Sequence, residues 1–461
     1  MSRILRPALI QRSCRGAKVP FLIKHKFIPR GALVLPGDKS IAHRALILGA
    51  LSCGKTTIDN FPLHDDSYAT IQVLEALGVK IVRQQDKVFI YGCGMQGFRA
   101  PCQPLFAHNS GTTLRLMLGV LAGLDFRARI TAWPGLKARP MSRVTKPLRL
   151  MGAKIQARIK HNEEYAPLTV RGGKLTGITY LPDIASAQVK SAILLAGLFA
   201  QGKTTVIERL PTRDHTERML KAFGADIAIK NSRVTLKPGL ELKSPGKIYI
   251  PGDVSSAAFF CVLAAIIPGS KVTLKGVGLN PGRTGAVKVL KRMGAKIKVK
   301  ISPPSPSQEP AGDLIMQSSR LKGTTVSARE IPFLIDELPV LMVAACFALG
   351  KTVIQSAQEL RVKETDRINS MVTNLRRMGA DILVAKKGRQ EKITIIGQGF
   401  LRGANLSSFG DHRSAMSLMV AAYAACGDST IDDISCISKS FPGFLKVLKG
   451  LKGKLRGFDG R

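Results

Sequence analysis

The chain has 461 residues, of which 45% are hydrophobic and 22% charged, as in globular proteins of two or three domains. Its 70 Lys and Arg residues against 31 Asp and Glu give a formal net charge of +39, which favours anionic partners: nucleic acid, an anionic surface or small anionic substrates. Aromatic residues make up only 5%, too few for base-stacking platforms, and no apolar run reaches the roughly 18 residues of a membrane span. We therefore expect no specific nucleic-acid partner and no membrane partner.

Cysteine usage indicates the compartment. Eight cysteines occur without any CxxC spacing, and several stand inside apolar runs. This pattern predicts reduced, mostly buried thiols of a cytoplasmic protein and argues against disulfides or metal ligands. Residues 1–19 are rich in Arg and contain no acidic residue. We interpret them as a basic N-terminal extension, with an organellar targeting segment as the minor alternative.

In chain order, the first predicted elements are an apolar helix after the turn Pro36–Asp38, then a glycine and a β-branched strand in "LSCGKTTIDNF". The next helix is amphipathic and ends in "LEALGVKI" (Leu74–Ile81), where a glycine again precedes a strand. The first pattern recurs as "GLDFRARITAW", "LFAQGKTTVIER", "IIPGSKVTLKGV", "FALGKTVIQSA" and "ACGDSTIDDIS", and the second begins again at Leu148, Leu220, Leu290 and Leu375. The chain is thus predicted to hold six helix–strand–helix–strand units of about seventy residues each.

Two similar joints divide these units into three and three. "LPGDKSIAHRA" (Leu35–Ala45) precedes the first unit, and "IPGDVSSAAFF" (Ile250–Phe260) precedes the fourth. We predict an α/β protein with two similar lobes joined by two crossover strands. The first lobe spans 38–249, and the second spans 20–37 plus 250–461, so that the N-terminal strand completes it. A cleft between domains is a favoured place for a small-molecule site.

Two segments match the phosphate-loop pattern GxxxxGK[ST], "GALSCGKT" (Gly49–Thr56) and "GLFAQGKT" (Gly197–Thr204). That motif works when a strand precedes the loop and a helix follows it, because the helix N-terminal amides then face the phosphates. Here an apolar helix precedes each match and a strand follows it. We therefore predict no nucleotide loop at either place.

Charged and small residues stand at corresponding helix starts in successive units. The first joint carries Lys39, Ser40 and Arg44, where the second has Val254, Ser255 and Phe259. Helix N-termini favour anions, so we expect the first joint to face substrate and the second to act as a hinge. Lys39 and Arg44 are expected to converge from the start of one helix. The alternative for each such position is a helix cap with a solvated face.

Ten motifs occur in a characteristic order from about Pro20 to the end: "PGDKSIAHR", "NSGTTLR", "ARPMSRV", "ASAQVKSA", "TRDHTE", "NPGRTG", "IDELPVL", "LRVKETDR", "DHRSAMS" and "SKSFPGF". On these motifs the chain resembles the EPSP synthases of the enolpyruvyl transferase family. The resemblance implies two lobes, each of three βαβαββ units in an inverse α/β barrel-like arrangement. It also implies a cytoplasmic enzyme without organic cofactor or metal, and we expect a monomer.

The activity implied by the resemblance is transfer of the enolpyruvyl group of phosphoenolpyruvate to the 5-hydroxyl of 3-phosphoshikimate. The reaction proceeds by addition and elimination, releases phosphate and serves aromatic amino acid biosynthesis through the shikimate pathway. Residues implied for 3-phosphoshikimate are Lys39, Ser40, Arg44, Ser186, Ala187, Gln188, Arg213, Asp336 and Lys363. Residues implied for phosphoenolpyruvate are Lys39, Gly111, Arg139, Gln188, Arg367, Arg413 and Lys439, with Asn109 in the same pocket.

The resemblance also implies catalytic roles. Asp336 is expected to be the base at the 5-hydroxyl, and Glu364 and Lys39 are candidates to protonate the methylene carbon. The alternative for Asp336 is an N-cap on the helix "ELPVLMVAACFA". Because Gly111 has no methyl group, the phosphoenolpyruvate pocket is expected to admit glyphosate, a slightly longer anion.

Three positions depart from the family pattern. His108 stands where a glycine is common, Trp133 and Pro134 occupy an expected hairpin, and Ala187 replaces a second serine. One rival is an enolpyruvyl transferase acting on UDP-N-acetylglucosamine, but "WPGLKARP" lacks the cysteine usual in that family. The rival of another class is an RNA-binding or RNA-end-processing protein, which the high charge favours and salt-dependent RNA retention would support.

Overall fold

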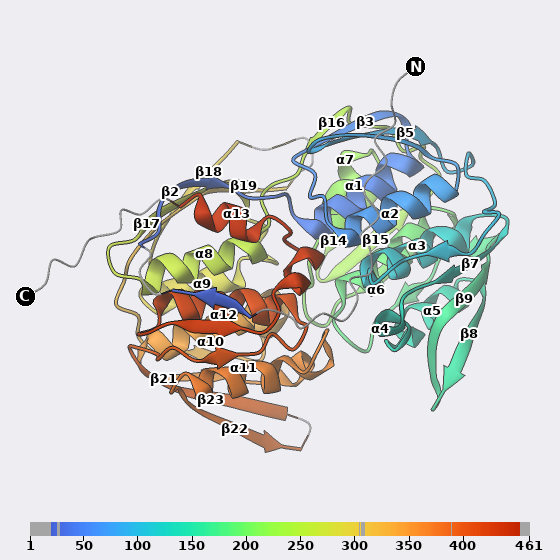
Figure 1. Cartoon of the computed structure of the whole chain (residues 1–461). Coiled ribbons are helices and arrows are strands. Elements are labelled where there is room, and N and C mark those ends of the chain that lie inside the picture. The colour runs from blue at the N-terminus through green and yellow to red at the C-terminus, as the bar shows by residue number, and fades with distance from the viewer. Residues whose placement is uncertain (1–19, 25–27, 304, 306–308, 389, 452–461) are drawn as a thin grey trace, which may run out of the picture.

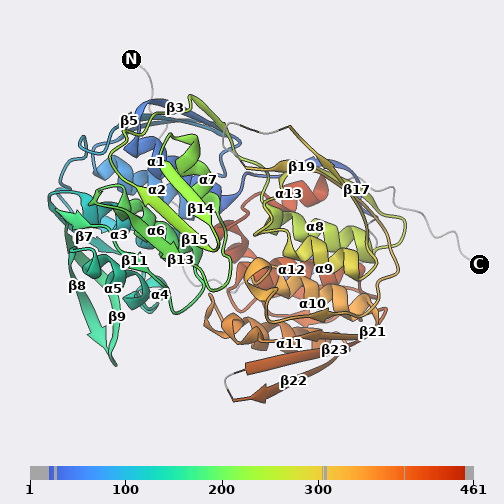
Figure 2. The same cartoon turned by 180° about the vertical axis from the view of Figure 1, so that it is seen from behind.

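The computed structural model describes residues 20–24, 28–303, 305, 309–388 and 390–451, so the predicted extension 1–19 lies outside the described residues. Two lobes lie side by side, the first in blue to green and the second mainly in yellow to red (Figure 1). Figure 2 shows the same two lobes from behind. Among the described residues, no helix is long and apolar enough to cross a membrane.

The first lobe contains three four-stranded sheets, each with one parallel and two antiparallel pairings. Their strand orders are β16-β3-β5-β4 (Lys247–Tyr249, Cys53–Asp59, Lys87–Cys93, Lys80–Gln84), β6-β7-β9-β8 (Leu105–Phe106, Arg127–Thr131, Glu163–Arg171, Lys154–Lys160) and β11-β13-β15-β14 (Thr179–Tyr180, Thr204–Ile207, Arg233–Lys237, Asp226–Lys230). A two-stranded sheet joins β10 (Leu175–Thr176) and β12 (Ala200–Gln201). The helices are α1 (Lys39–Leu51), α2 (Asp65–Ala76), α3 (Gly111–Gly123), α4 (Pro134–Lys137), α5 (Ser142–Leu150), α6 (Ala187–Gly197) and α7 (His215–Ala222).

The second lobe repeats this plan with one change. Two four-stranded sheets have the orders β2-β17-β19-β18 (Arg30–Val34, Lys271–Gly278, Ala311–Gln317, Lys296–Ile301) and β20-β21-β23-β22 (Thr325–Val326, Leu349–Ile354, Gln390–Gln398, Asp381–Lys387). The third has the order β1-β25-β24 (Phe21–Ile23, Ser429–Ile431, Asn405–Leu406), so β1 from the chain start supplies the antiparallel neighbour of the last unit. The helices are α8 (Val254–Ile266), α9 (Gly285–Arg292), α10 (Leu338–Phe347), α11 (Arg367–Arg377), α12 (His412–Ala424) and α13 (Phe444–Lys449).

Each lobe has its own hydrophobic core. One cluster of buried side chains runs from Ile41 to Ile250, and the other contains Ile23, Leu35 and side chains from Val254 to Leu451. The helices α3 and α6 approach closely in the first core, since a Cβ on Gly119 would lie 2.2 Å from the Ala192 carbonyl oxygen. The helices α8, α10 and α12 are buried nearly all round, as expected for the centre of a lobe.

The predicted helix–glycine–strand repeat is confirmed. The glycines after α2, α5, α7, α9 and α11 all have left-handed backbones, with φ between +86° and +107°: Gly78, Gly152, Gly224, Gly294 and Gly379. This conformation ends a helix, and glycine adopts it without a Cβ clash. Both phosphate-loop matches run from a helix into a strand, from α1 to β3 and from α6 to β12, so the exclusion of nucleotide loops is also confirmed.

The two joints bind each other. The Asp38 N–H donates to the Pro251 carbonyl at 2.8 Å, and the Asp253 N–H donates to the Pro36 carbonyl at 3.0 Å. Each aspartate then caps a helix, because Asp38 Oδ1 accepts from the Ser40 N–H of α1 and Asp253 Oδ1 accepts from the Ser255 N–H of α8. The crossing therefore holds the N-terminal ends of α1 and α8 together between the lobes.

Seven cysteines lie among the described residues, and all are unbridged. Three are buried, two are half-buried, and Cys102 and Cys426 are exposed. The prediction of free thiols is confirmed for these residues, but the prediction that most are buried is wrong. Position in an apolar run does not determine burial when the run ends at a turn, as it does at Cys426.

Candidate active site

A cavity of about 60 Å³ lies between the lobes, and polar side chains line it almost entirely. Residues of both lobes contribute: Lys39, Ser40, Arg213, Asp253, Arg283, Asp336, Glu364, Arg367, His412 and Arg413. Seven of these are site residues predicted from the sequence. The cavity is small because cations and carboxylates within it pair with one another.

Two ion pairs cross from one lobe to the other. Arg213 Nη2, from the turn between β13 and α7, lies 2.8 Å from Asp336 Oδ2. Arg139 Nη2, between α4 and α5, lies 3.3 Å from Glu364 Oε1. Both carboxylates belong to the second lobe, so Arg139 and Arg213, two predicted anion-binding arginines of the first lobe, each contact a predicted acid–base group of the second.

Arg367, the first residue of α11, forms ion pairs with three carboxylates. Its buried guanidinium lies 2.5 Å from Glu364 Oε2, 3.0 Å from Asp411 Oδ2 and 3.4 Å from Asp336 Oδ1. Burial alone would lower the pKa of Arg367, but Asp411 and Glu364 raise it above the ordinary arginine value. Arg367 is therefore a permanent cation that orients both proposed acid–base groups.

The same charges set the protonation of the two carboxyl groups. Burial opposes ionisation of Asp336, but Arg213 and Arg413 hold its pKa well below the ordinary value. Burial likewise opposes ionisation of Glu364, and Arg367 more than offsets it, so the pKa of Glu364 is also strongly lowered. Both groups are therefore carboxylates at neutral pH in this structure, and the facing cations oppose their protonation until other anions take those cations over.

Lys39 is the first residue of α1 and is held by a residue that sequence reasoning missed. Its Nζ lies 2.9 Å from Asp66 Oδ2, at the start of α2. Burial lowers the pKa of Lys39, but the Asp66 carboxylate raises it more, so the net shift is upward. Lys39 remains an ammonium group, and the acidic pair in "HDDSYA" was the available sign of its partner.

Three predicted phosphoenolpyruvate residues of the first lobe, Gly111, Arg139 and Gln188, lie around Arg115, a residue of "NSGTTLR" to which no role was assigned from the sequence. A Cβ on Gly111 would lie 3.1 Å from Arg115 Nη1 and 3.8 Å from Arg139 Nη1. Gln188 Oε1 accepts from Arg115 Nη1 at 2.7 Å. Nearby, Asn109 Oδ1 lies 3.7 Å from where Gly135 would carry a Cβ. In the second lobe, Lys439 Nζ donates to the Gly410 carbonyl at 3.2 Å, just before α12.

Arg44 lies apart from the cavity, inside the first lobe. Its Nε donates to Thr216 Oγ1 at 2.6 Å and its Nη2 to Ser191 Oγ at 2.7 Å. Lys39 and Arg44 thus point to different partners, and the expected convergence is not found. Five helical residues advance about 140° beyond a full turn, so the two side chains leave opposite sides of α1.

Besides Arg44 and the residues around Arg115 and Gly410, the predicted residues outside the lining of the interlobe cavity are Ser186, Ala187 and Lys363. Ser186 caps α6 by accepting from the Val189 N–H at 3.4 Å, and Ala187 begins that helix. Lys363 follows a turn of 3-10 helix, and its pKa is lowered by burial despite the Asp336 and Glu359 carboxylates. A lysine whose charge costs more to bury gains more from an anionic ligand.

The structure corrects two local predictions. The helix α10 begins at Leu338 after Glu337, so Asp336 is not its N-cap, and its carboxylate faces Arg213 and Arg367 instead. Pro134 begins the short helix α4 where a hairpin was expected, because proline is favoured at a first helical position.

His108, which stands where the resemblance implies a glycine, has a backbone conformation that glycine adopts readily. Its φ is +51°, in the left-handed region, and its carbonyl accepts from the Trp133 N–H at 2.8 Å. The imidazole ring lies 4.9 Å from the Phe106 ring and bonds Gln72 Oε1 at 2.6 Å. The turn into α3 is therefore kept, with local contacts supporting a strained histidine.

Arg283, in "NPGRTG", was also missed. It lies 3.2 Å from Asp38 Oδ2 and 2.9 Å from Asp253 Oδ1, so one buried guanidinium serves both joints. Burial opposes ionisation of Asp38, but Arg283 lowers its pKa, whereas burial and the Asp38 charge raise the pKa of Asp253. The second joint is thus not only a backbone hinge, because Asp253 itself lines the cavity.

Comparison with known proteins agrees with this architecture. The family model of EPSP synthase (3-phosphoshikimate 1-carboxyvinyltransferase) matches residues 29–448. A 3-phosphoshikimate 1-carboxyvinyltransferase of Desulforamulus reducens is 49% identical over 421 residues, 91% of this chain and 96% of that protein. The protein of the same name from a Geobacter species is 46% identical over 422 residues, 92% of this chain and 96% of that one.

A solved structure of EPSP synthase from Acinetobacter baumannii is 41% identical and superposes with a TM-score of 0.84, covering 94% of this chain and 97% of that chain. The α/β fold class predicted from the repeats is thereby confirmed. The chain belongs to the EPSP synthase family, the 3-phosphoshikimate 1-carboxyvinyltransferases.

Proposed function

We propose that the interlobe cavity is where this chain carries out the reaction of its family, transfer of the enolpyruvyl group of phosphoenolpyruvate to the 5-hydroxyl of 3-phosphoshikimate. One observation carries this proposal. Lys39, Arg213, Arg367 and Arg413 meet there with two carboxylates, Asp336 and Glu364. Both substrates carry a phosphate and a carboxylate, which arginine binds in bidentate fashion and lysine as a point charge.

We assign the 3-phosphoshikimate side to Lys39, Ser40, Arg44, Ser186, Ala187, Gln188, Arg213, Asp336 and Lys363. The placement of Arg213 in the cavity and of Gln188 beside Arg115 supports this side. Arg44 acts through the Ser40 carbonyl, to which its Nη1 donates at 2.8 Å. We assign the phosphoenolpyruvate side to Lys39, Gly111, Arg139, Gln188, Arg367, Arg413 and Lys439.

In the addition step, the 5-hydroxyl oxygen bonds to C2 of phosphoenolpyruvate while Asp336 accepts the hydroxyl proton and C3 gains a proton. In the elimination step, C3 loses a proton and the C2–O bond to phosphate breaks. Glu364 acquires its proton-donor role when phosphoenolpyruvate takes over Arg139 and Arg367, because removing these cations from Glu364 raises its pKa. Lys39 is the second candidate donor.

Proton transfer by positioned groups contributes about 10²–10⁴-fold in rate. Holding the two bound reactants in the correct orientation removes roughly 7–11 kcal/mol of the activation barrier. Substrate positioning is therefore a larger contribution to the rate than proton transfer. The two ion pairs that cross between the lobes support this view. They are contacts that substrate anions would replace with contacts of their own.

The deciding experiment is inorganic phosphate release from phosphoenolpyruvate with and without 3-phosphoshikimate. We expect release only when both are present. Release with UDP-N-acetylglucosamine instead would identify the rival acceptor, which the family match argues against. No release with either acceptor would refute the proposed function.

We further propose a cytoplasmic monomer with lobe boundaries at 38–249 and at 20–37 plus 250–461, and without a specific nucleic-acid partner. The two separate cores and the unbridged cysteines support these assignments. Light scattering during gel filtration tests the monomer. Retention on immobilised RNA across a salt gradient tests the rival, and binding that persists at physiological salt would support it.

A further inference from the structure

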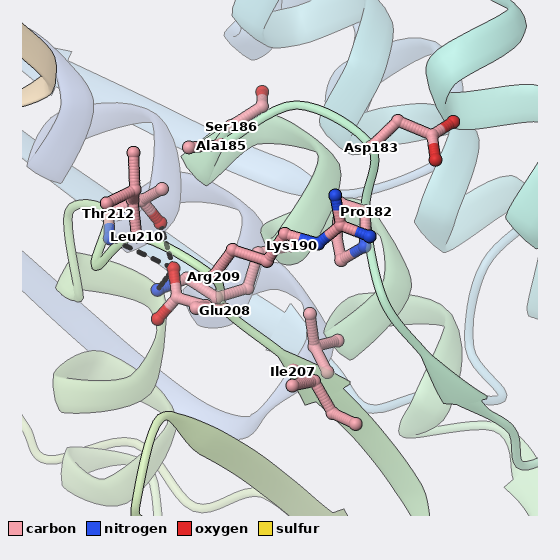
Figure 3. Close-up of a pocket in the computed structure, with 11 residues that line it drawn as sticks. Pro182, Asp183, Ala185, Ser186, Lys190, Ile207, Glu208, Arg209, Leu210 and Thr212 are labelled. Carbon is pink, nitrogen blue, oxygen red and sulfur yellow. Dashed lines mark hydrogen bonds and ion pairs between the residues drawn. The ribbon is translucent and has the colours of Figure 1, made fainter.

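A buried ion-pair cluster lies at the turn that carries Arg213, and none of its residues lines the interlobe cavity. The side chain of Lys190, on α6, is 2% exposed, and its Nζ lies 2.9 Å from Glu208 Oε1 and 2.5 Å from Glu217 Oε1. Figure 3 shows Lys190 extending from α6 towards Glu208, which follows β13. Burial raises the pKa of Glu217 although Lys190 opposes the shift. The proposed mechanism uses none of these three residues.

Within this cluster, Lys190 and Glu208 hold the turn 208–214, which connects β13 with α7. Glu208 Oε1 accepts from the Thr212 N–H at 3.0 Å and from Thr212 Oγ1 at 2.5 Å (Figure 3). The Glu208 N–H donates to the Ser232 carbonyl at 2.8 Å, which anchors the start of the turn to the sheet. A single carboxylate oxygen, fixed by Lys190, therefore closes the turn immediately before Arg213.

Residues on the other side of Arg213 are held as well. Asp214 Oδ1 accepts from Asn280 Nδ2 of the second lobe at 2.6 Å. Ser191, the neighbour of Lys190 on α6, bonds Thr216 Oγ1 at 2.6 Å. The helix α6 thus fixes the chain before and after Arg213, and its first turn carries Gln188.

Packing alone does not hold this turn. A second cavity of about 120 Å³ lies against it, lined by Ile207, Leu210 and Ser186 among others (Figure 3). A turn with unfilled space on one side depends on its polar tether for a defined position. A buried ion pair is also no better for stability than apolar residues of the same volume, so a positioning role fits it better than a purely stabilising one.

We propose that Lys190 and Glu208 are positioning residues for Arg213, and that through it they set the affinity for 3-phosphoshikimate. This inference rests on the proposed function of Arg213. The tether keeps the Arg213 guanidinium at the cleft, where it reaches Asp336 at 2.8 Å. Without the Lys190–Glu208 tether, the turn moves towards the second cavity, and the Arg213 guanidinium is no longer positioned to bind the substrate anion.

The test is a split between the two Michaelis constants. Glu208→Ala is expected to raise KM for 3-phosphoshikimate about tenfold, the size of one lost hydrogen bond to a charged group, while KM for phosphoenolpyruvate stays unchanged. Glu217→Gln is the matched control, since Glu217 contacts Lys190 but not the turn, and neither constant should change. Thr212→Val should reproduce part of the Glu208 effect, and Thr212→Ser, which keeps the hydroxyl, should restore wild-type behaviour.

A double-mutant cycle shows whether Glu208 acts through Arg213. Glu208→Ala in an Arg213→Gln background should raise KM for 3-phosphoshikimate no further, because neighbours that act as one unit are not additive. Additive effects, or an unchanged KM in Glu208→Ala, would overturn the inference. If Glu208→Ala does not fold, the Thr212 pair decides, and equal KM values for Val and Ser would overturn it. An active wild type in which Arg213→Gln leaves KM unchanged would instead refute the role proposed for Arg213.

Discussion

Arg213 of the first lobe and Asp336 of the second lie 2.8 Å apart and form an ion pair across the cleft. One is the proposed cation for 3-phosphoshikimate and the other the proposed base. Each therefore satisfies the other in this structure, and substrate binding must exchange this contact for contacts with the bound anion. A substrate phosphate or carboxylate offers Arg213 the same kind of bidentate partner that Asp336 offers it here.

Asp336 and its neighbour Glu337 should respond very differently to loss of their charge. Asp336→Asn is expected to lower the rate of phosphate release about 10²–10⁴-fold, because the amide cannot accept the hydroxyl proton. The pKa of Glu337 is raised by burial and by the Asp336 charge, and its carboxyl accepts from Ser255 Oγ. Glu337→Gln keeps that shape and should leave the rate unchanged. Equal rates for Asp336→Asn and the wild type would remove Asp336 from the mechanism.

Arg283 should be among the most sensitive positions for folding. Arg283→Met leaves Asp38 and Asp253 buried without their shared cation, and loss of one partner of a buried ion pair costs about 3–5 kcal/mol in the free energy of unfolding. Urea unfolding measures this loss. Lys87→Met removes an exposed ammonium group from Asp59, which keeps Lys247 at 2.9 Å, and should cost about 0–1 kcal/mol.

A compensating change tests the reason for that sensitivity. Asp253→Asn keeps a side-chain oxygen for the α8 cap but removes one of the two charges that Arg283 serves. Added to Arg283→Met, it should recover part of the lost stability. A double variant as unstable as the sum of the single variants would show that charge is not the cause.

Glyphosate should inhibit the wild-type chain in competition with phosphoenolpyruvate. Gly111→Ala would place a methyl group 3.1 Å from Arg115 Nη1, so the pocket must yield by a few tenths of an ångström. We expect the inhibition constant of the longer anion to rise more than KM for phosphoenolpyruvate. A wild type indifferent to millimolar glyphosate, or equal changes in both constants, would contradict this account of Gly111.

Stability should fall on acidification below pH 6.5. Burial, assisted by Lys39, lowers the pKa of His64 to about 4, and burial lowers that of His412 to about 3. Between about pH 6.5, the ordinary histidine value, and these folded-state values, the unfolded chain binds protons that the folded chain does not. Each such histidine therefore removes up to about 1.4 kcal/mol of unfolding free energy per pH unit as the pH falls.

The variant His64→Asn isolates one of these protons. His64 Nδ1 accepts from the Ser67 N–H at 3.0 Å as the cap of α2, and asparagine is itself a favoured cap. Urea unfolding between pH 6.5 and pH 4 should give a shallower pH dependence for this variant, by about one proton. An identical slope for variant and wild type would mean that His64 titrates normally in the folded chain.

Local sequence patterns were sufficient to predict where the helices end and strands begin. The glycines at 78, 152, 224, 294 and 379 end helices by a backbone preference that needs no tertiary information. The same holds for the order of helix and strand that ruled out nucleotide loops. The last unit was less regular than its sequence pattern, because its antiparallel partner β1 comes from the distant chain start.

The repeat, the two joints, the family, and the helix starts that carry Lys39, Gly111, Gln188, Arg367 and Arg413 could all be predicted from the sequence. These features follow from residue order and short-range geometry. Which of these side chains contact one another depended on the packing of the whole fold. In the folded chain, the Arg44 side chain lies inside the first lobe and Lys39 pairs with Asp66. Arg283 lies between the two joints and pairs with the aspartate of each. Such pairings depend on the packing of helices that are distant in sequence. A buried charge is costly unless it is paired, and the packing of the fold determines which opposite charges lie close enough to pair with it.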